Sequence, residues 1–498
     1  MNNGKICIPV TGATADEMIA NINLAAEVAD LIELRVDSLE PDEIEPLFRK
    51  LKPVDHQKPF LITFRPKEQG GCRDLTIHER QSFWANGNDD FWGGDFEEDV
   101  VEESMIWPGE NIICSYHDFE EVPGNIEQIY ERLKGVKNFS RASIFKLAVQ
   151  PADIADSIPL WKLLKKARNE NVPFVPVAMG EAGKWTRILG PAFGAPLTYA
   201  SLEDGGGNAP GQISAKDLID VYRVKELSSK TRVYAIIGDP VSASLSPFMH
   251  NAAYPETGID AVFLHMEVRD LDRFVREFIP QAGLNFGGFA VTMPHKETII
   301  PYLDEIDETA RKIGAVNTVK FKGGRLYGYN TDAYGFIEPL KARYGNLTGA
   351  RVGILGAGGA ARACVYALQQ ENAVVTIFAR NPAKAAPLAE EFGIDVRALP
   401  AGDLENIDVL VNTTPLGMKP GQENFTLLKA ENLANVKLVY DLITKPAETG
   451  LVKEAKKAGI TTIGGIEMLV TQGIKQFEIW TGRDAPAEAM RSAAIERL

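Results

Sequence analysis

Cysteine is scarce in this chain of 498 residues. The four cysteines, Cys7, Cys72, Cys114 and Cys364, stand far apart, and none has a CxxC spacing. Closely spaced cysteine pairs are the usual signature of a zinc site, and a fold held by disulfides needs a denser set. We therefore expect reduced, mostly buried thiols and no metal site.

Long apolar runs and an excess of positive charge are also missing. No stretch approaches the roughly 18 apolar residues that a membrane-spanning helix needs, and the first residues do not resemble a signal peptide. We therefore expect a cytoplasmic protein without a membrane partner. The net charge of −15 argues against a nucleic-acid partner, because neutralising phosphates takes clustered Lys and Arg. An anionic substrate must accordingly meet locally placed cations.

The length exceeds what one ordinary core can fill and predicts at least two domains. The composition, 45% hydrophobic and 24% charged, is typical of a globular protein. A short polar segment, residues 225–231 (KELSSKT), marks the predicted boundary between a first part, 1–226, and a second part that starts at 232.

Short apolar segments alternate with amphipathic ones through residues 1–226. The predicted strands are 5–10, 31–37, 59–65, 111–117, 144–150, 172–179 and 196–201, with a weaker one at 91–97. Eight strands in about 220 residues predict an α/β fold, a (β/α)8 TIM barrel. Catalytic side chains of such barrels lie at the C-terminal strand ends, where this chain places Glu33, Arg35, Arg65, His117, Lys146 and Met179.

Lys146 is the most informative of these residues, since its strand is otherwise apolar. Its ammonium could extend to solvent, or burial could favour a neutral amine able to form a Schiff base with a ketone. His117 alone would more often be structural, but beside such a lysine it is a candidate proton shuttle. Glu33 and Arg35 share one face of their strand. They are an exposed edge pair or, as we favour, buried charges in the barrel mouth.

The motifs of residues 1–226 resemble those of type I 3-dehydroquinate dehydratase. They are Glu33-Leu-Arg35-Val-Asp37, Thr63-Phe-Arg65, Ser115-Tyr-His117-Asp118, Phe145-Lys146, Met179-Gly…Thr186-Arg187 and Ala209-Pro-Gly-Gln212. The resemblance implies that Lys146 forms an imine with the substrate ketone, that His117 moves the protons, and that Arg187 holds the substrate carboxylate. It further implies a set of residues that contact or position the substrate: Glu33, Arg35, Arg65, Met179, Asn208 and Gln212.

Two positions depart from the usual pattern of this family. Gln69 stands where the family usually has glutamate four residues after Arg65, with Glu68 beside it. Without that charge, we expect either that Glu68 turns inward or that Arg65 binds substrate more directly. Asn208 stands where the family usually has serine, in the glycine-rich segment 204–208, which we expect to be a mobile lid.

Four polar clusters follow predicted strands at the start of the second part. Ser244 and Ser246 stand two apart in a turn before a helix, where they can bind a carboxylate or simply cap the helix. The other clusters contain Thr292 with Lys296, Asn317, and Asp332. A solvated lysine and Asx-type turns are the alternative interpretation, but four such clusters in one domain favour a site.

Residues 351–362 (RVGILGAGGAAR) predict a strand, a glycine turn and a helix. This is the context that a dinucleotide-binding G-x-G-x-x-A motif requires. Arg380 and Lys384 follow the next predicted strand, where an NAD-binding domain places an acidic residue, and cations there suit the 2′-phosphate of NADP. The cofactor-binding residues that these segments predict are Gly356, Ala357, Gly358, Gly359, Ala360, Ala379, Arg380 and Lys384.

The second part resembles shikimate dehydrogenase over residues 232–498. Further motifs that carry this resemblance are Asn412-Thr-Thr-Pro415-Leu-Gly417, Tyr440-Asp441-Leu and Met468-Leu469-Val-Thr-Gln472-Gly473. The resemblance implies a two-lobed α/β enzyme: a substrate-binding domain at 232–342, an inserted Rossmann NADP domain at 343–463, and C-terminal helices at 464–498. Lys296 and Asp332 would form the catalytic pair, and the substrate contacts would be Ser244, Ser246, Thr292, Asn317, Tyr440 and Gln472. The resemblance adds Thr413, Gly465 and Met468 to the cofactor-binding residues.

Together the two resemblances imply consecutive reactions on small molecules. 3-Dehydroquinate is dehydrated to 3-dehydroshikimate, which is then reduced with NADPH to shikimate. The sequence leaves the oligomeric state open, and a monomer is compatible with one chain that carries both sites. Two alternatives stay open: a quinate/shikimate dehydrogenase as the second part, or a non-catalytic ligand-sensing regulator. The presence of His117, Lys146 and Lys296 disfavours the regulator.

Overall fold

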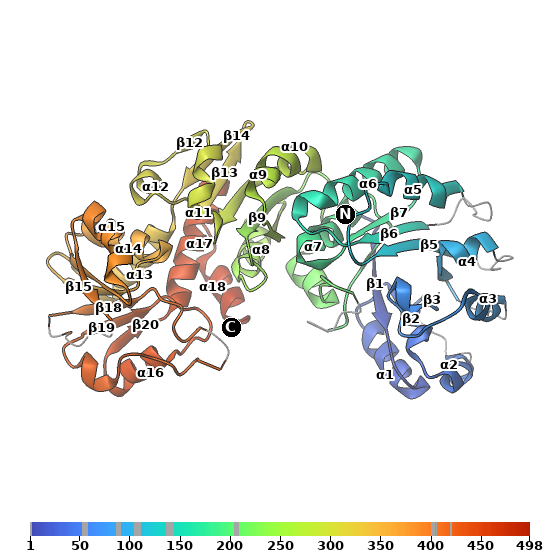
Figure 1. Ribbon diagram of the computed structural model, residues 1–498, viewed down its shortest axis with the longest axis horizontal. Coiled ribbons are helices and arrows are strands. Elements are labelled where there is room, and N and C mark those ends of the chain that lie inside the picture. Colours follow the sequence, from blue (N-terminus) through green and yellow to red (C-terminus); the bar gives the residue numbers. More distant parts are fainter. Residues whose placement is uncertain are drawn as a thin grey trace. The chain divides into compact units, whose positions relative to one another are not determined.

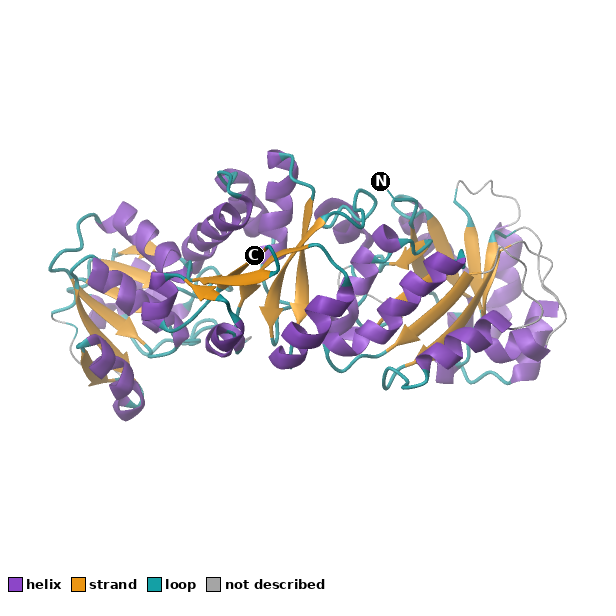
Figure 2. Cartoon of the chain, turned by 90° about the horizontal axis from the view of Figure 1, so that it is seen from above, coloured by secondary structure: helices purple, strands orange, loops and turns teal. Residues whose placement is uncertain are grey.

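A computed structural model describes the chain except residues 1, 52–57, 86–90, 104–110, 136–143, 204–208, 400–403, 405 and 419–420. The chain forms two compact units. Unit 1 comprises Met1–Val233, Ile237–Ser242 and Asp260–Asn285, and unit 2 comprises Tyr234–Ile236, Ala243–Ile259 and Phe286–Leu498. In both units helices surround the strands (Figure 2). Within the described ranges, no helix has the length and apolar character needed to cross a membrane.

Unit 1 contains the predicted parallel barrel (Figure 1). Its strands are β1 (Lys5–Val10), β2 (Leu31–Arg35), β3 (Phe60–Thr63), β4 (Gly93–Glu97), β5 (Asn111–Asp118), β6 (Ile144–Val149), β7 (Phe174–Ala178) and β8 (Leu197–Tyr199). They pair in the order β7-β6-β5-β4-β3-β2-β1-β8, so that the eight-stranded sheet is nearly closed. The predicted fold class is therefore confirmed, and the strand at 91–97, the weakest prediction, is a full member of the barrel.

Helices between the strands cover the barrel. They are α1 (Ala15–Ala26), α2 (Ile44–Leu51), α3 (Ile77–Ala85), α4 (Glu98–Glu103), α5 (Ile126–Gly135), α6 (Ile158–Glu170) and α7 (Gly180–Leu189). The start of α1 shows the local cause, because the Thr14 side chain accepts a hydrogen bond from the Glu17 amide and thereby caps the helix. Met18 and Ile22 of α1 are buried one turn apart, which gives the helix an apolar face.

The barrel interior changes from apolar to polar toward the C-terminal strand ends. Leu31, Leu61, Ile113 and Ile144 belong to one buried apolar cluster. Side chains two residues apart share a strand face, so the rows that begin with these residues continue with buried polar side chains. The polar continuations are Glu33 and Arg35, Thr63 and Arg65, Ser115, and Lys146. This polar layer is where the first site forms.

β2 ends two residues earlier than the sequence predicted. Val36–Ser38 form a 3₁₀ turn directly after Arg35. The Asp37 carboxylate accepts two hydrogen bonds from the Arg35 guanidinium, at 3.0 and 2.8 Å. Arg35 is thus neutralised by Asp37 and not by Glu33, whose carboxylate accepts a hydrogen bond from the Thr63 hydroxyl at 2.5 Å.

The second part of the chain contains two further sheets. The first has the strand order β10-β9-β11-β13-β14-β12. Its strands are β9 (Arg232–Gly238), β10 (Ala261–Glu267), β11 (Phe286–Val291), β12 (Glu305–Ile306), β13 (Thr318–Lys322) and β14 (Arg325–Tyr329). The helices that accompany it are α8 (Ser246–Thr257), α9 (Leu271–Arg273), α10 (Ile279–Ala282), α11 (His295–Thr298) and α12 (Glu308–Ile313).

The other sheet is parallel and has the order β17-β16-β15-β18-β19-β20. Its strands are β15 (Arg351–Leu355), β16 (Val374–Ala379), β17 (Asp395–Ala398), β18 (Val409–Asn412), β19 (Leu438–Asp441) and β20 (Thr461–Ile463). The remaining helices are α13 (Asp332–Tyr344), α14 (Gly359–Gln370), α15 (Pro382–Phe392), α16 (Gly450–Lys457), α17 (Gly465–Thr481) and α18 (Ala487–Ile495). Numbered within this sheet the order is 3-2-1-4-5-6, the dinucleotide-binding arrangement with its crevice between β15 and β18.

Candidate active sites

The first site is a cavity at the C-terminal ends of the barrel strands. Its lining includes Glu33, Arg35, Arg65, Gln69, His117, Lys146, Met179, Arg187, Tyr199 and Gln212. The structure thus brings together the residues that the sequence predicted for this site, with one exception. Asn208 and the expected lid, 204–208, lie outside the described residues.

Lys146 lines this cavity and is only 4% exposed, so the interpretation that its ammonium extends to solvent is wrong. Its ammonium donates a hydrogen bond to the Asp95 carboxylate and lies 3.4 Å from the Tyr199 hydroxyl. Burial lowers the pKa of Lys146, although the Asp95 charge opposes this shift. A larger fraction of the amine is therefore neutral, and nucleophilic, than in an exposed lysine.

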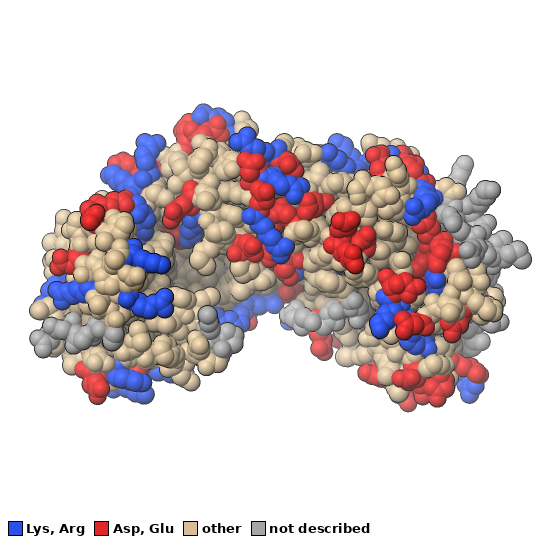
Figure 3. All heavy atoms as spheres, viewed as in Figure 1, with Lys and Arg blue, Asp and Glu red and all other residues tan. Residues whose placement is uncertain are grey.

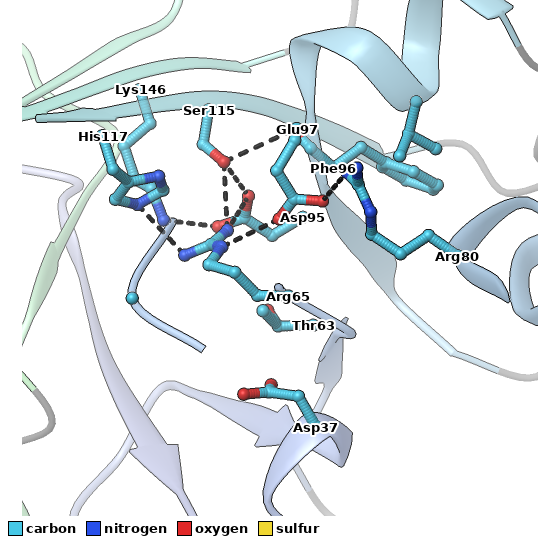
Figure 4. A network of polar contacts seen from close by, with 12 residues as sticks. Asp37, Thr63, Arg65, Arg80, Asp95, Phe96, Glu97, Ser115, His117 and Lys146 are labelled. Atoms are coloured by element: carbon cyan, nitrogen blue, oxygen red, sulfur yellow. Dashed lines mark hydrogen bonds and ion pairs between the residues drawn. The ribbon is translucent and has the colours of Figure 1, made fainter. Parts of the chain in front are cut away.

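Arg65 links the lysine to a network of buried charges (Figure 4). Its guanidinium lies 2.6 Å from Asp95 and donates to Glu97 at 2.9 Å and to the Ser115 hydroxyl at 3.0 Å. Arg80 pairs with the other oxygen of Glu97 at 3.2 Å. Burial alone would raise the pKa of Asp95, but Arg65 and Lys146 outweigh it and hold that pKa at about 2. Asp95 is therefore a permanent anion between two cations.

His117 contacts the same arginine. Its Nε2 lies 3.0 Å from Nη1 of Arg65. Because a guanidinium only donates hydrogen bonds, Nε2 is the acceptor and the proton of the neutral ring resides on Nδ1. Burial, followed by the charges of Arg65 and Lys146, lowers the pKa of His117 well below its usual value. The ring is thus neutral near pH 7 and is able to accept a proton.

The two expectations about Gln69 have different outcomes. Glu68 is exposed, so the expectation that it turns inward is wrong. Both residues lie in the 3₁₀ turn η3 (Lys67–Gln69). With about three residues per turn, neighbouring side chains point in different directions, and Gln69 occupies the inward one. Arg65 receives its negative partners from Asp95 and Glu97, and its direct contact with substrate stays a prediction.

Arg187 of α7 is a buried cation with unused hydrogen-bond donors. Its side chain is 2% exposed, Nη2 donates to the Pro210 carbonyl at 3.2 Å, and Nε is buried without a partner. Burial lowers its pKa to about 10, so it stays protonated near pH 7. Among the described residues, no ion pair involves Arg187. The cavity therefore offers a positive charge to an anionic group of a ligand.

Asp95, Glu97, Ser115 and Tyr199 surround Lys146 or Arg65, and the sequence reasoning assigned no site role to any of them. A signal for two of them was present, because Asp95 and Glu97 are two residues apart in a predicted strand, as are Glu33 and Arg35. Two carboxylates on one strand face in a barrel predict cations on the neighbouring strands.

The second site lies in unit 2, where Lys296 and Asp332 form an ion pair at 2.6 Å. Asp332 is the first residue of α13, and a helix N-terminus stabilises its carboxylate. The Asn317 amide donates to the other Asp332 oxygen at 2.8 Å and lies 3.4 Å from Oε1 of Gln472. These four residues come from separate segments of the sequence, and the structure brings them together.

The other predicted substrate contacts of the second site differ in how deeply they are buried. Ser246 begins α8, and its amide donates to the Ser244 hydroxyl at 3.3 Å. Thr292 is half-buried directly after β11. Tyr440 is completely buried in β19 and stacks on Phe336 with ring centroids 5.3 Å apart. The roles of these four residues in substrate binding stay predictions.

The glycine turn after β15 fits a dinucleotide. Gly356 has a φ of +101°, and a Cβ atom there would lie 2.8 Å from Oγ1 of Thr413. At Gly358 and Gly359, by contrast, a Cβ would meet nothing within 4 Å. The backbone at the start of α14 is therefore open to a pyrophosphate at a helix N-terminus, and Ala360 follows in the first turn of that helix.

Cations stand where the sequence placed them beside this turn. Arg380 follows Ala379, the last residue of β16, and Lys384 lies in the first turn of α15. Both side chains are exposed, and in the described part of the chain neither forms an ion pair. Gly465 begins α17, and Met468 follows one turn later. Charges of both signs are interspersed on the face shown in Figure 3, so selectivity for an anion depends on such local cations.

No group of three or more His, Cys, Asp and Glu residues in the described ranges is arranged to hold a metal ion.

A family model of type I 3-dehydroquinase matches residues 6–229. Models of the shikimate dehydrogenase substrate binding domain, of shikimate/quinate 5-dehydrogenase and of the shikimate 5′-dehydrogenase C-terminal domain match 236–319, 338–417 and 465–495. Fold and sites thus define a chain that joins a type I dehydroquinase to a shikimate dehydrogenase. The "bifunctional 3-dehydroquinate dehydratase/shikimate dehydrogenase, chloroplastic" of Arabidopsis thaliana is 35% identical over 519 residues, which cover 98% of this chain and 83% of that protein. The chain belongs to this bifunctional family.

Relatives of the second part alone are also similar. The NADP(+) shikimate dehydrogenase of Methanocaldococcus jannaschii is 41% identical over 282 residues, 55% of this chain and 99% of that protein. A crystal structure of a shikimate dehydrogenase in complex with NADP+ is 40% identical, with a TM-score of 0.51, and covers 54% of this chain and 96% of its own.

Proposed function

We propose that this chain dehydrates 3-dehydroquinate to 3-dehydroshikimate and reduces that product to shikimate with NADPH. One observation carries the first activity: a buried amine, Lys146, and a buried arginine with unused donors, Arg187, line one cavity with His117. The second activity is supported by the Lys296–Asp332 pair in a chain with an open dinucleotide turn. The presence of all these groups favours an enzyme over a ligand-sensing regulator.

In the dehydratase, Arg187 binds the substrate carboxylate and Lys146 attacks the ring ketone. Loss of water from that adduct gives an imine, which makes the adjacent C–H acidic. His117 takes this proton and returns it to the hydroxyl that departs as water. Hydrolysis of the imine then releases 3-dehydroshikimate and restores the amine. For Nε2 of His117 to act as the base, it must leave Arg65, which keeps its bonds to Asp95, Glu97 and Ser115.

Glu33, Arg35, Arg65, Met179, Gln212 and Asn208 complete the proposed substrate contacts of the barrel. Arg35 is fixed for this task, because Asp37 and the Gly70 carbonyl hold its guanidinium. A group fixed before the substrate arrives costs little reorganisation when it binds.

In the reductase, NADPH supplies the hydride when bound. Lys296 donates a proton to the alkoxide that forms on the substrate, and Asp332 orients Lys296 and a ring hydroxyl. Asn317 and Gln472 hold ring hydroxyls together with Thr292 and Tyr440, and Ser244 and Ser246 bind the carboxylate at the start of α8. The proposed domains are 1–226, 232–342, 343–463 and 464–498, the last returning to the substrate-binding domain.

NADPH would be held by the β15–α14 turn together with residues of other segments. Gly356 and Ala357 form the turn, and the amides of Gly358, Gly359 and Ala360 at the start of α14 would bind the pyrophosphate. Arg380 and Lys384, with Ala379 before them, would bind the 2′-phosphate. Thr413, Gly465 and Met468 would complete the cofactor site.

A coupled assay tests both activities. Purified protein mixed with 3-dehydroquinate and NADPH should lose the absorbance of NADPH and accumulate shikimate. Lys146→Ala should stop this reaction but still oxidise NADPH when 3-dehydroshikimate is supplied. Lys296→Ala should convert 3-dehydroquinate only as far as 3-dehydroshikimate. The proposal would be refuted if the wild-type protein failed to oxidise NADPH both with 3-dehydroquinate and with 3-dehydroshikimate.

A further inference from the structure

Residues Asp260–Asn285 belong to the same compact unit as the barrel, although they lie inside the stretch that matches the shikimate dehydrogenase substrate domain. They contain β10, α9, the π-helical turn Phe274–Phe278 and α10. We propose that this segment is a positioning element of the dehydratase, which holds α7, and with it Arg187, in place for the substrate carboxylate. The inference rests on the role of Arg187 under the proposed function.

The first support is an apolar cluster around α7. Trp185, two residues before Arg187, is 1% exposed, and the Phe278 ring meets it edge-on at 5.2 Å. Trp161 of α6 packs on Trp185 at 4.5 Å. Its indole N–H donates to the Ala282 carbonyl at 2.9 Å. A buried N–H that lost this acceptor would be left unsatisfied. Helix α7 also packs along β10.

The second support is a set of polar contacts at the loop that follows β6, the strand of Lys146. Asp153 is buried, and its carboxylate accepts hydrogen bonds from the amides of Arg269 and Asp270 at 2.9 and 3.1 Å. Arg273 donates to Asp156 at 2.8 Å. A carboxylate that accepts hydrogen bonds from backbone amides forms a stronger contact than a carboxylate in an exposed ion pair. The loop is thus anchored to the same segment as α7.

The other side of α7 has no spare room. A Cβ atom at Gly183 would lie 2.2 Å from the Ala178 carbonyl, so α7 packs directly on β7. The helix is therefore clamped between β7 and the segment 260–285. Weakening the second contact lets α7 move away from the barrel, and Arg187 moves with it. Lys146 lies on β6 and keeps its own partners. The loss should thus appear in substrate binding and spare the chemical steps.

The test is Phe278→Ala in the full-length protein. We expect the KM for 3-dehydroquinate to rise by about 10-fold, with kcat within about 2-fold of wild type, because the change weakens binding of ground and transition states alike. Phe278→Leu, which keeps most of the volume, should restore KM. Lys162→Ala is the matched control, because it removes only the exposed Lys162–Gln281 bond, 2.7 Å, at the same surface and should change nothing. Trp161→Phe, which removes one hydrogen bond and keeps the ring, should raise KM by up to about 10-fold and serves if Phe278→Ala does not fold.

A double-mutant cycle separates positioning from general weakening. Arg187→Ala alone should raise KM by about 10–150-fold, the worth of a charge-assisted bond. If Phe278 acts through Arg187, Phe278→Ala should add nothing in the Arg187→Ala background. An unchanged KM in Arg187→Ala would refute the proposed role of Arg187. Additive effects of the two changes, or an unchanged KM in folded Phe278→Ala and Trp161→Phe, would overturn the positioning inference while leaving that role intact.

Discussion

Replacing Asp95 with asparagine tests the charge network around the reactive lysine. The Asp95 carboxylate is completely buried, accepts hydrogen bonds from Lys146 and from the Ser115 hydroxyl at 2.5 Å, and forms an ion pair with Arg65 at 2.6 Å. Asp95→Asn keeps the shape and removes the charge. Removing one partner of a buried ion pair costs about 3–5 kcal/mol, because the remaining charge is left uncompensated. We expect the free energy of unfolding of the variant to fall by that amount at pH 7.

The same change should lower the pKa of Lys146 further. Burial already lowers that pKa, and Asp95 is the main group that opposes the shift. A unit charge about 4 Å away at an effective dielectric constant of about 20 is worth about 4 kcal/mol. Arg65 shares the Asp95 carboxylate, so Lys146 loses only part of this stabilisation in Asp95→Asn, and its pKa falls. The amine then loses its proton at lower pH.

Borohydride trapping of the imine measures this shift. Wild type and Asp95→Asn are mixed with 3-dehydroquinate and borohydride over a pH series, and the adduct on Lys146 is quantified. The acid limb of adduct formation should move to lower pH in Asp95→Asn. Ser115→Ala, which leaves the charges of Asp95 and Lys146 in place, is the control. Its acid limb of adduct formation should stay near that of wild type. A limb that stays in place or moves to higher pH would refute the reasoning about Asp95.

The stability difference should itself depend on pH. The pKa of Asp95 is about 2 in the folded protein, below its ordinary value of 3.8. A carboxyl with a depressed folded pKa contributes stability above its unfolded pKa and loses it as the pH falls through the folded one. The gap between wild type and Asp95→Asn in urea unfolding should therefore be full above about pH 4 and shrink toward pH 2.

Four further substitutions test the other assignments. Lys296→Ala or Asp332→Ala should slow reduction of 3-dehydroshikimate by about 10²–10⁴-fold without changing dehydratase turnover; joint loss of both activities would indicate misfolding instead. Arg380→Ala should raise the KM for NADPH by about 10–150-fold and leave that for NADH unchanged, whereas equal losses would make Arg380 a structural residue. Gln69→Glu should raise the pKa of His117, because a carboxylate counteracts the neighbouring cations, and so move the acid limb of dehydration to higher pH. If the acid limb of the pH profile does not move, a charge at residue 69 does not affect His117.

The barrel and much of its site were predictable from the sequence because both follow from strand periodicity. Residues 144–149 alternate so that Ile144, Lys146 and Ala148 share a face, and the lysine had to enter the interior. The partners of each charge were not predictable in the same way. Arg35 pairs with Asp37 because β2 ends at Arg35 and the chain turns. Glu68 stays exposed to solvent because residues 67–69 form a 3₁₀ turn, and the polar sequence of these three residues does not predict such a turn.

Grouping into units was also beyond sequence reasoning. The polar segment 225–231 predicts a boundary, yet residues 260–285, which follow it, belong to the same compact unit as the barrel. Their apolar positions, such as Phe274 and Phe278, indicate burial but not the surface against which they are buried. That information resides in complementary shapes, here the edge of Phe278 against Trp185, and not in periodicity.

The shared cluster of Trp161, Trp185 and Phe278 bears on how such a chain can be taken apart. A protease cut within 225–231 breaks one covalent link. It leaves in place the hydrogen bond from the Trp161 indole to the Ala282 carbonyl and the one from the Arg269 amide to the Asp153 carboxylate. The two pieces would stay together as a non-covalent complex, as a nicked protein does. A gene divided at the same point would instead yield two fragments, each with an apolar face made for the other. In this protein the packing of Trp161, Trp185 and Phe278, and not the covalent segment 225–231, keeps the two pieces together.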